Sequence, residues 1–193
     1  GIMTRFTFQS PISIRRFLLR VLLINPRFQL PIDTRTTPHL GIAYLAAVSE
    51  RRGDEVRVFD MDVEDVKLTD FVREYEPEIV GITSNTPQVK QGWYAAREIK
   101  SVRDVLIVQG GPHVSAFPEE SASREEIDVV ARGEGEDTWI ELCNILEYVK
   151  ANHPQFKTRD LLDPASKVLN GVLGITYQTH DGKIHHTHER PAI

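Results

Sequence analysis

Five short runs rich in valine, isoleucine and leucine recur along the chain, and this repeat limits the folds open to it. The runs span residues 20–25, 55–59, 78–83, 106–109 and 127–131. Each is too short for an ordinary helix, and β-branched residues favour strands. Between the runs, apolar residues recur at helical spacing. Strands that alternate with helices predict a parallel sheet covered on both faces, because crossover connections are right-handed.

The segments between and after the runs predict five helices. They span residues 38–52, 68–75, 87–102, 118–124 and 138–150. The first has the clearest ends, because Thr37 and Pro38 supply an N-cap and a first-turn proline, and Gly53 supplies a C-cap. We therefore expect an α/β fold of the Rossmann-like class: a doubly wound, five-stranded parallel sheet with flavodoxin-like strand order and helices on both faces.

The last quarter of the chain has a different pattern. Residues 171–178 and 183–187 predict two strands joined by the turn signal Asp181-Gly182. This β-hairpin either adds antiparallel strands to the sheet edge or begins a further module. The expected organisation is a tail, a main domain, a polar linker, and a C-terminal segment that contains the hairpin. Their ranges are 1–19, 20–150, 151–167 and 168–193.

The composition of the chain limits the cellular compartments and the classes of binding partner that are expected for it. The net charge is −5, and lysine and arginine are spread out without a basic stripe, which argues against nucleic acid as a partner. No apolar stretch approaches the roughly 20 residues of a membrane-spanning helix. Cys143 is the single cysteine, so an internal disulfide, an iron–sulfur cluster and a multi-thiolate zinc site are excluded within this chain. A soluble, cytoplasmic protein is expected, with Cys143 as a buried apolar residue.

Polar and glycine-rich residues follow four of the five runs. They are Asn25-Pro26, Thr83-Ser84-Asn85-Thr86, Gly110-Gly111-Pro112-His113 and Gly133-Glu134-Gly135-Glu136-Asp137. The carboxyl ends of parallel strands lie at one edge of the sheet, where open α/β sheets bind ligands. Two successive glycines leave backbone without Cβ atoms, so a wide, flat ligand can lie against the main chain. We interpret this edge as a cofactor site.

Several nucleotide sites are excluded by the residues directly after the first run. A nicotinamide site requires G-x-G-x-x-G there, and this chain has N-P-R-F-Q at residues 25–29. A P-loop is absent. A phospho-acceptor receiver needs an acidic pair after the first run and an aspartate after the third, where this chain has Asn25 and Thr83. The hydroxyl-rich phosphate loop of flavodoxin is also missing after the first run.

Four motifs occur in a characteristic order. They are P-H-L-G-I-A-Y-L-A-A at 38–47, V-G-I-T-S-N-T at 80–86, G-G-P-H-V-S-A-F-P-E-E at 110–120 and R-G-E-G-E at 132–136. Together they resemble the amino-terminal cobalamin-binding domain of cobalamin-dependent radical S-adenosylmethionine enzymes. That group includes the anaerobic Mg-protoporphyrin monomethyl ester cyclase-like proteins and many methylases. Residues 174–193 resemble the hairpin and lead-in before the radical domain.

The resemblance implies that the strand ends hold the corrin of cobalamin, with its nucleotide tail inserted alongside the sheet. Thr83 and Asn85 take the places of serine and leucine in the S-x-L motif of other cobalamin domains, and Gly110-Gly111 match their paired glycines. The D-x-H-x-x-G motif, whose histidine binds cobalt from below, has no counterpart after Asn25. We therefore expect cobalamin bound with its own base displaced and no protein imidazole on the metal. The expected binding residues are Asn25, Pro26, His39, Leu40, Gly41, Thr83, Ser84, Asn85, Thr86, Gly110, Gly111, Pro112, His113, Gly133, Glu134, Gly135 and Glu136.

Five histidines have simpler interpretations than metal binding. His39 and His113 are expected to hydrogen-bond to backbone or corrin amides and not to bind cobalt. In a strand, His186 and His188 share one face and His185 lies on the other, which favours a solvated hairpin over a metal site. No residue is assigned as a metal ligand.

The carboxylates and the single cysteine limit the chemistry of the chain itself. Glu134 and Glu136 are interpreted as helix N-terminal carboxylates that also accept hydrogen bonds from ligand amides, and no residue is assigned as catalytic. The radical half of such enzymes needs three cysteines, usually C-x-x-x-C-x-x-C, for the [4Fe–4S] cluster that cleaves S-adenosylmethionine. The chain is therefore expected to bind and orient cobalamin for a methylase or a cyclase. The alternatives are a flavodoxin-like sensor or carrier for FMN or another nucleotide, and a docking domain without ligand.

Overall fold

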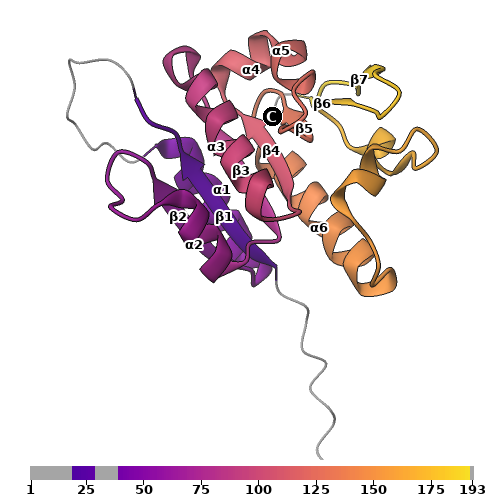
Figure 1. The fold of residues 1–193 in the computed structure, drawn as a ribbon. Coiled ribbons are helices and arrows are strands. Elements are labelled where there is room, and N and C mark those ends of the chain that lie inside the picture. The colour runs from indigo at the N-terminus through magenta and orange to yellow at the C-terminus, as the bar shows by residue number, and fades with distance from the viewer. Residues whose placement is uncertain (1–18, 29–38, 192–193) are drawn as a thin grey trace, which may run out of the picture.

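The structure is a computed structural model that describes residues 19–28 and 39–191 (Figure 1). The strands are β1 (Arg20–Asn25), β2 (Glu55–Asp60), β3 (Ile79–Thr83), β4 (Leu106–Gly110), β5 (Val129–Ala131), β6 (Ile175–Gln178) and β7 (Ile184–His186). The α-helices are α1 (Leu40–Arg52), α2 (Leu68–Tyr75), α3 (Val89–Val102), α4 (Pro112–Ala116), α5 (Pro118–Ala122) and α6 (Glu136–Asn152). Short 3-10 helices are η1 (Thr86–Gln88), η2 (Thr158–Leu162) and η3 (Val168–Gly171).

One sheet of seven strands, in the order β2-β1-β3-β4-β5-β6-β7, forms the centre of the molecule. The first five strands are parallel, and their order 2-1-3-4-5 confirms the expected flavodoxin-like sheet. The hairpin of β6 and β7 pairs antiparallel with β5. Of the two possibilities left open for it, the hairpin therefore extends the sheet edge.

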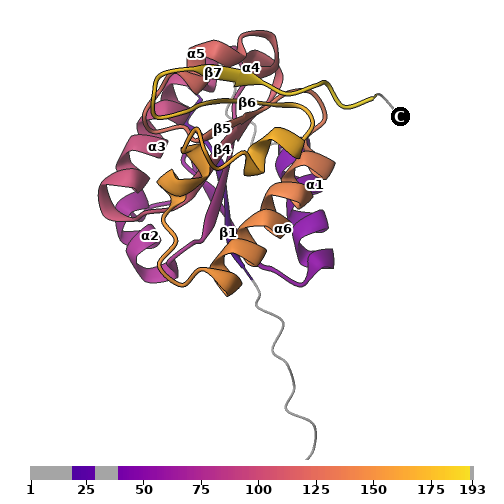
Figure 2. The same ribbon diagram turned by 90° about the vertical axis from the view of Figure 1, so that its right-hand side faces the viewer.

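Helices cover the two faces of the sheet, with α1 and α6 on one face and α2 and α3 on the other (Figure 2). The alternation along β3 shows why both faces are apolar. Ile79 packs in the cluster under α1 and α6, whereas Val80 and Ile82 pack in the cluster on the α2 and α3 face. A strand apolar on both sides is stable only between two helical layers.

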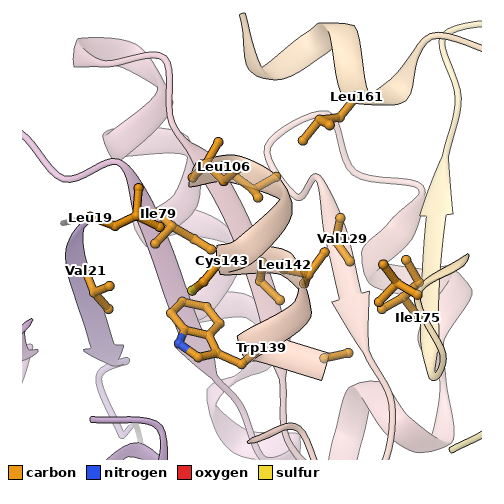
Figure 3. Packing of buried hydrophobic residues seen from close by; sticks show 14 of the residues in the cluster. Leu19, Val21, Ile79, Leu106, Val129, Trp139, Leu142, Cys143, Leu161 and Ile175 are labelled. Atoms are coloured by element: carbon orange, nitrogen blue, oxygen red, sulfur yellow. The ribbon is translucent and has the colours of Figure 1, made fainter. Parts of the chain in front are cut away.

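The helix α6 packs one apolar stripe onto the sheet, as the spacing of its residues predicts (Figure 3). Trp139 and Cys143 lie on this stripe and are 2% and 0% exposed. The burial of Cys143 confirms its interpretation as an apolar core residue, and this burial also raises the pKa of its thiol. Among the described residues, no helix is both long enough and apolar enough to cross a membrane.

The structure differs from the expected elements where turns are tight. Helix α4 is not predicted, because its five residues are too few to show a period; Pro112 at its first turn starts it. The strand expected at 171–178 begins only at Ile175, since Gly174 has a φ of +73° and interrupts the extended run. The predicted cap at Thr37 and Pro38 lies outside the described residues.

The segment 151–167, expected as a linker, packs against the domain. The 3-10 helix η2 lies within it, and its Leu161 is 3% exposed in the cluster under α6. Thr158 is also buried, and its backbone N–H donates to Asp104 Oδ2 at 3.1 Å. These contacts fix where the chain returns to form β6.

Candidate functional site

A narrow cavity opens at the carboxyl ends of the parallel strands, between the sheet and the helices α1 and α6. We call it the edge slot, and its volume is about 210 Å³. It is lined by Leu23, His39, Gly41, Ile42, Leu45, Gly81, Ile82, Thr83, Val108, Gly110, Gly111, Pro112, Ala131, Gly133, Glu134, Gly135, Glu136 and Trp139. A concave, largely apolar space at this sheet edge is the usual form of a ligand site in such folds.

The edge slot has an apolar floor and a polar mouth, and the strand register separates the two. Leu23, Gly81 and Val108 lie side by side on neighbouring strands and form the floor. Thr83 and Gly110 are also register partners and lie two residues further along, about 6.6 Å nearer the strand ends. The mouth therefore presents a hydroxyl and bare backbone, while the floor presents hydrocarbon.

Gly81 lets the side chains of Leu23 and Trp139 pack closely over the floor. A Cβ atom at this position would lie 2.9 Å from Leu23 Cδ2 and 3.0 Å from the Trp139 ring. The indole of Trp139 is itself fixed, because its Nε1–H donates to Ser49 Oγ at 2.8 Å. The indole N–H is thus already bonded and leaves only ring carbon for a ligand in the slot.

The two glycines after β4 have different roles. Gly111 has a φ of +113°, and a Cβ atom there would lie 2.5 Å from the backbone oxygen of Ser84. Gly111 is therefore required for the close approach of two loops. Gly110 has no such constraint, because its Cβ would meet only Ala131, at 3.9 Å. At Gly110 the missing side chain instead leaves space in the edge slot.

Ser84 and Gln109 connect the loop after β3 to the next strand. Ser84 is 0% exposed, its N–H donates to the Gly110 carbonyl at 2.9 Å, and its Oγ accepts a hydrogen bond from Gln109 Nε2 at 2.8 Å. Gly92 on α3 permits this bond, because a Cβ there would lie 2.7 Å from Gln109 Nε2. Ser84 thus holds the loop that carries Asn85 and Thr86.

Asn25 at the end of β1 is occupied by neighbouring side chains. Its Nδ2–H donates to Asp60 Oδ2 at 3.1 Å, and its Oδ1 accepts from Gln88 Nε2 at 3.1 Å. Gln88 also donates to the carbonyl of Pro26 at 2.8 Å. This network joins the ends of β1 and β2 to η1, and Asn25 is not among the residues that line the edge slot.

His113 is held by hydrogen bonds at both ring nitrogens. Its Nδ1 lies 3.2 Å from Thr86 Oγ1, and its Nε2 lies 2.8 Å from Glu120 Oε2. Its ring also packs against Phe117, with ring centroids 5.5 Å apart. The expected partners of His113 were backbone or corrin amides, whereas the partners found are side chains of η1 and α5.

His39 precedes α1 and lines the edge slot at its mouth. Its Nδ1 is buried and has no hydrogen-bond partner among the described residues. Burial lowers the pKa of this imidazole, so at neutral pH it is uncharged and has one donor and one acceptor nitrogen. A ligand in the mouth could therefore supply the missing partner.

Arg132, the first residue of R-G-E-G-E, holds the hairpin against β5. Its guanidinium donates to Thr176 Oγ1 at 2.9 Å and to the carbonyl of Thr187. The next residue, Gly133, has a φ of +73° and donates its N–H to Ser115 Oγ at 2.9 Å. The motif thus combines a structural cation with a turn that places Glu134 at the mouth of the edge slot.

A second, more polar cavity of about 830 Å³ lies beside the edge slot and shares three mouth residues with it. The shared residues are Gly133, Glu134 and Glu136. Its other side is formed by Tyr44 on α1 and by the chain after β7. Together the two cavities make a continuous surface, narrow and apolar at one end and wide and polar at the other.

The hairpin histidines are separate from both cavities. His186 Nε2 lies 2.9 Å from Glu119 Oε1, and His185 stacks on Tyr177 with an interplanar angle of 11°. In the part of the chain that the structure describes, no group of three or more His, Cys, Asp or Glu side chains could hold a metal ion.

Ten of the seventeen residues expected from the sequence line the edge slot: His39, Gly41, Thr83, Gly110, Gly111, Pro112, Gly133, Glu134, Gly135 and Glu136. The other seven are not among its lining residues: Asn25, Pro26, Leu40, Ser84, Asn85, Thr86 and His113. The sequence reasoning missed the floor. The available signal was Gly81, which lies two residues before Thr83 and so on the same face of β3.

A family model described as the B12 binding domain matches residues 34–142. An uncharacterised methyltransferase of Pyrococcus horikoshii is 33% identical over 184 residues, which cover 91% of this chain and 36% of that protein. The anaerobic magnesium-protoporphyrin IX monomethyl ester cyclase of Rubrivivax gelatinosus is 28% identical over 183 residues, 91% of this chain and 30% of the cyclase. The chain thus spans about a third of the length of these relatives.

A solved structure has the same fold. It is the radical S-adenosylmethionine methyltransferase TsrM from Kitasatospora setae, with cobalamin and a [4Fe-4S] cluster bound. The TM-score is 0.63 at 22% sequence identity, and the match covers 92% of this chain and 30% of that chain.

Proposed function

Because the chain belongs to the B12-binding domain family, we propose that it binds cobalamin at the carboxyl edge of its sheet, with the nucleotide base of the cofactor in the edge slot. The observation that carries this proposal is the apolar floor of Leu23, Gly81 and Val108 beneath the mouth left bare by Gly110. The corrin then lies over the wide polar cavity, and the tail enters the narrow apolar one.

The dimensions and chemistry of the two cavities support this placement. A cavity of roughly 150 Å³ lined by apolar side chains binds benzene. The edge slot, at about 210 Å³, therefore suits a bicyclic aromatic base. The mouth offers the Thr83 hydroxyl, the His39 imidazole and the carboxylates of Glu134 and Glu136, which suit ribose hydroxyls and corrin amides.

The residues of this chain bind and orient the cofactor, and the cofactor supplies the reactive metal. When bound, cobalamin provides a cobalt ion that can carry a methyl group. We place no residue of this chain in a catalytic role. The side chains at the mouth would hold the macrocycle in one orientation.

We further propose that no protein imidazole binds the cobalt. His113 has both ring nitrogens engaged by Thr86 and Glu120. The unpartnered Nδ1 of His39 is assigned to a ribose hydroxyl or a corrin amide at the slot mouth. The sequence between Asn25 and His39 contains no histidine. A base held in the edge slot would also be unable to bind the cobalt.

This assignment predicts the magnetic resonance spectrum of the reduced complex. Bound cob(II)alamin is expected to show no nitrogen superhyperfine splitting in its electron paramagnetic resonance spectrum, because no nitrogen binds the cobalt axially. His39→Ala and His113→Ala are expected to leave the cobalt signal unchanged. Triplet splitting in the wild-type protein that is lost in either variant would contradict the proposal and identify that histidine as the ligand.

Retention of cofactor tests cobalamin binding itself. The protein is incubated separately with hydroxocobalamin and with FMN, desalted, and examined by ultraviolet–visible spectroscopy. We expect corrin bands near one equivalent and no flavin bands. Flavin retention without corrin would favour the flavodoxin-like alternative, and retention of neither would favour a docking domain.

We also propose that the chain serves a cobalamin-dependent radical S-adenosylmethionine methylase or cyclase. This rests on the similarity to a methyltransferase and a cyclase, each about three times as long as the matched region. The partner in that reaction is then a radical domain that holds S-adenosylmethionine and a [4Fe–4S] cluster. The single cysteine here cannot hold that cluster, so the assembled enzyme needs the second domain for turnover.

A further inference from the structure

The floor of the edge slot is apolar, and the described residues that form it offer no free hydrogen-bonding side chain. Its strand residues Leu23, Gly81 and Val108 carry no hydrogen-bonding side chain, and Trp139 uses its indole N–H on Ser49. Leu45 completes this apolar lining from α1, one helical turn before Ser49. The polar residues of the lining lie at the strand ends and at the first turns of the two helices. A ligand group that reaches the floor therefore finds no hydrogen-bond partner among these side chains.

We propose that the floor selects among corrinoids by their lower base, favouring a benzimidazole over a purine. This inference rests on the proposed function, because it assumes that the base enters the edge slot. The ribose is attached to the five-membered ring of the base, and the ribose stays at the polar mouth. The six-membered ring consequently faces the floor. In dimethylbenzimidazole this ring carries two methyl groups, and in adenine it carries an amino group and two ring nitrogens.

The difference between the two bases comes from desolvation. Methyl groups gain free energy when they leave water for a hydrocarbon floor. The amino donor and the ring nitrogens of adenine lose their hydrogen bonds to water and gain none from these side chains. One unsatisfied buried group is enough to weaken binding by about tenfold. Adenine is also the weaker cobalt ligand of the two, so its easier displacement cannot account for tighter binding of the benzimidazole form.

The experiment compares three probes by spectroscopic titration: hydroxocobalamin, its adenine-containing analogue pseudocobalamin, and dicyanocobinamide, which lacks the nucleotide. We expect the wild-type domain to bind hydroxocobalamin about tenfold or more tightly than pseudocobalamin. Leu45→Gln introduces an amide beside the base, and it should reduce that ratio several-fold. Leu45→Met keeps the lining apolar and is expected to keep the ratio. The free-energy cost of displacing each base from cobalt is a property of the corrinoid and is the same for every variant. It therefore cancels when the ratio of the affinities for hydroxocobalamin and pseudocobalamin is compared between two variants.

The outcomes separate the two proposals. Base selection would be overturned if the wild-type domain bound hydroxocobalamin and pseudocobalamin equally well. It would also be overturned if the ratio of these two affinities were the same in Leu45→Gln as in the wild type. Both results would leave cobalamin binding in place. Retention of none of the three corrinoids would instead overturn the proposed function. Binding of dicyanocobinamide to each variant reports whether the corrin site is intact, so a misfolded variant is recognised directly.

Discussion

Replacing Gly110 by leucine is expected to weaken the binding of hydroxocobalamin at least about a hundredfold without unfolding the protein. The side chain would project into the edge slot, since a Cβ atom at this position meets only Ala131, at 3.9 Å. An aromatic base buries about 150 Å² or more, which at about 25 cal/mol per Å² corresponds to ~4 kcal/mol. Exclusion of the base from the slot loses most of this, and a loss of about 2.8 kcal/mol is already a hundredfold in affinity. Titration followed by the corrin absorption bands measures the change.

Two controls identify the slot as the cause. Gly171→Leu places the same side chain at an exposed glycine, where a Cβ atom meets nothing within 4 Å, and should leave the affinity unchanged. Dicyanocobinamide, which has no base, should bind Gly110→Leu and the wild type within a few-fold of each other. If Gly110→Leu binds hydroxocobalamin as tightly as the wild type does, the base does not occupy the edge slot.

Substitution of the neighbouring glycine, Gly111, is expected to have a large effect on the stability of the fold. Gly111→Ala is expected to lower the free energy of unfolding by about 3 kcal/mol, because alanine at a φ of +113° is strained and its Cβ would lie 2.5 Å from the Ser84 carbonyl oxygen. Neither backbone segment can move without breaking the hydrogen bond between the Ser84 N–H and the Gly110 carbonyl. Urea denaturation followed by far-ultraviolet circular dichroism measures the difference.

Gly110→Ala is the matched control for this second prediction. The two glycines are adjacent, but only Gly111 combines a positive φ with a backbone clash. Gly110→Ala should therefore change the free energy of unfolding by less than about 1 kcal/mol. Equal losses at both positions would show that the stability effect is not specific to the contact between Gly111 and Ser84.

The fold could be predicted from the sequence because each local signal agrees with the others. The apolar runs have strand length, the helical segments carry caps such as Gly53, and the parallel arrangement follows from their alternation. The resemblance carried by the G-G-P-H and R-G-E-G-E motifs was likewise confirmed by the match to the B12 binding domain. The helix α4 was not foreseen, because a five-residue helix started by a proline leaves no periodic pattern.

The site could be predicted only along its rim. Residues at strand ends are visible in a sequence as polar and glycine-rich clusters, so Thr83 and Gly110 were identified. Gly81 lies inside a buried strand, where a glycine has no distinguishing pattern until its neighbours Leu23 and Trp139 are known. Hydrogen bonds such as those of His113 to Thr86 and Glu120 join residues from separate loops, and periodicity contains no information on such pairs.

A crystal structure of the domain with bound hydroxocobalamin tests the central claim most directly, because the cobalt can be located by its anomalous scattering and the base by its electron density. The account predicts that the base is detached from the metal and fills the edge slot between Gly81 and the helices α1 and α6, with no histidine nitrogen on the cobalt. Density for a base that remains bound to cobalt, with the edge slot closed or filled only by solvent, would contradict it.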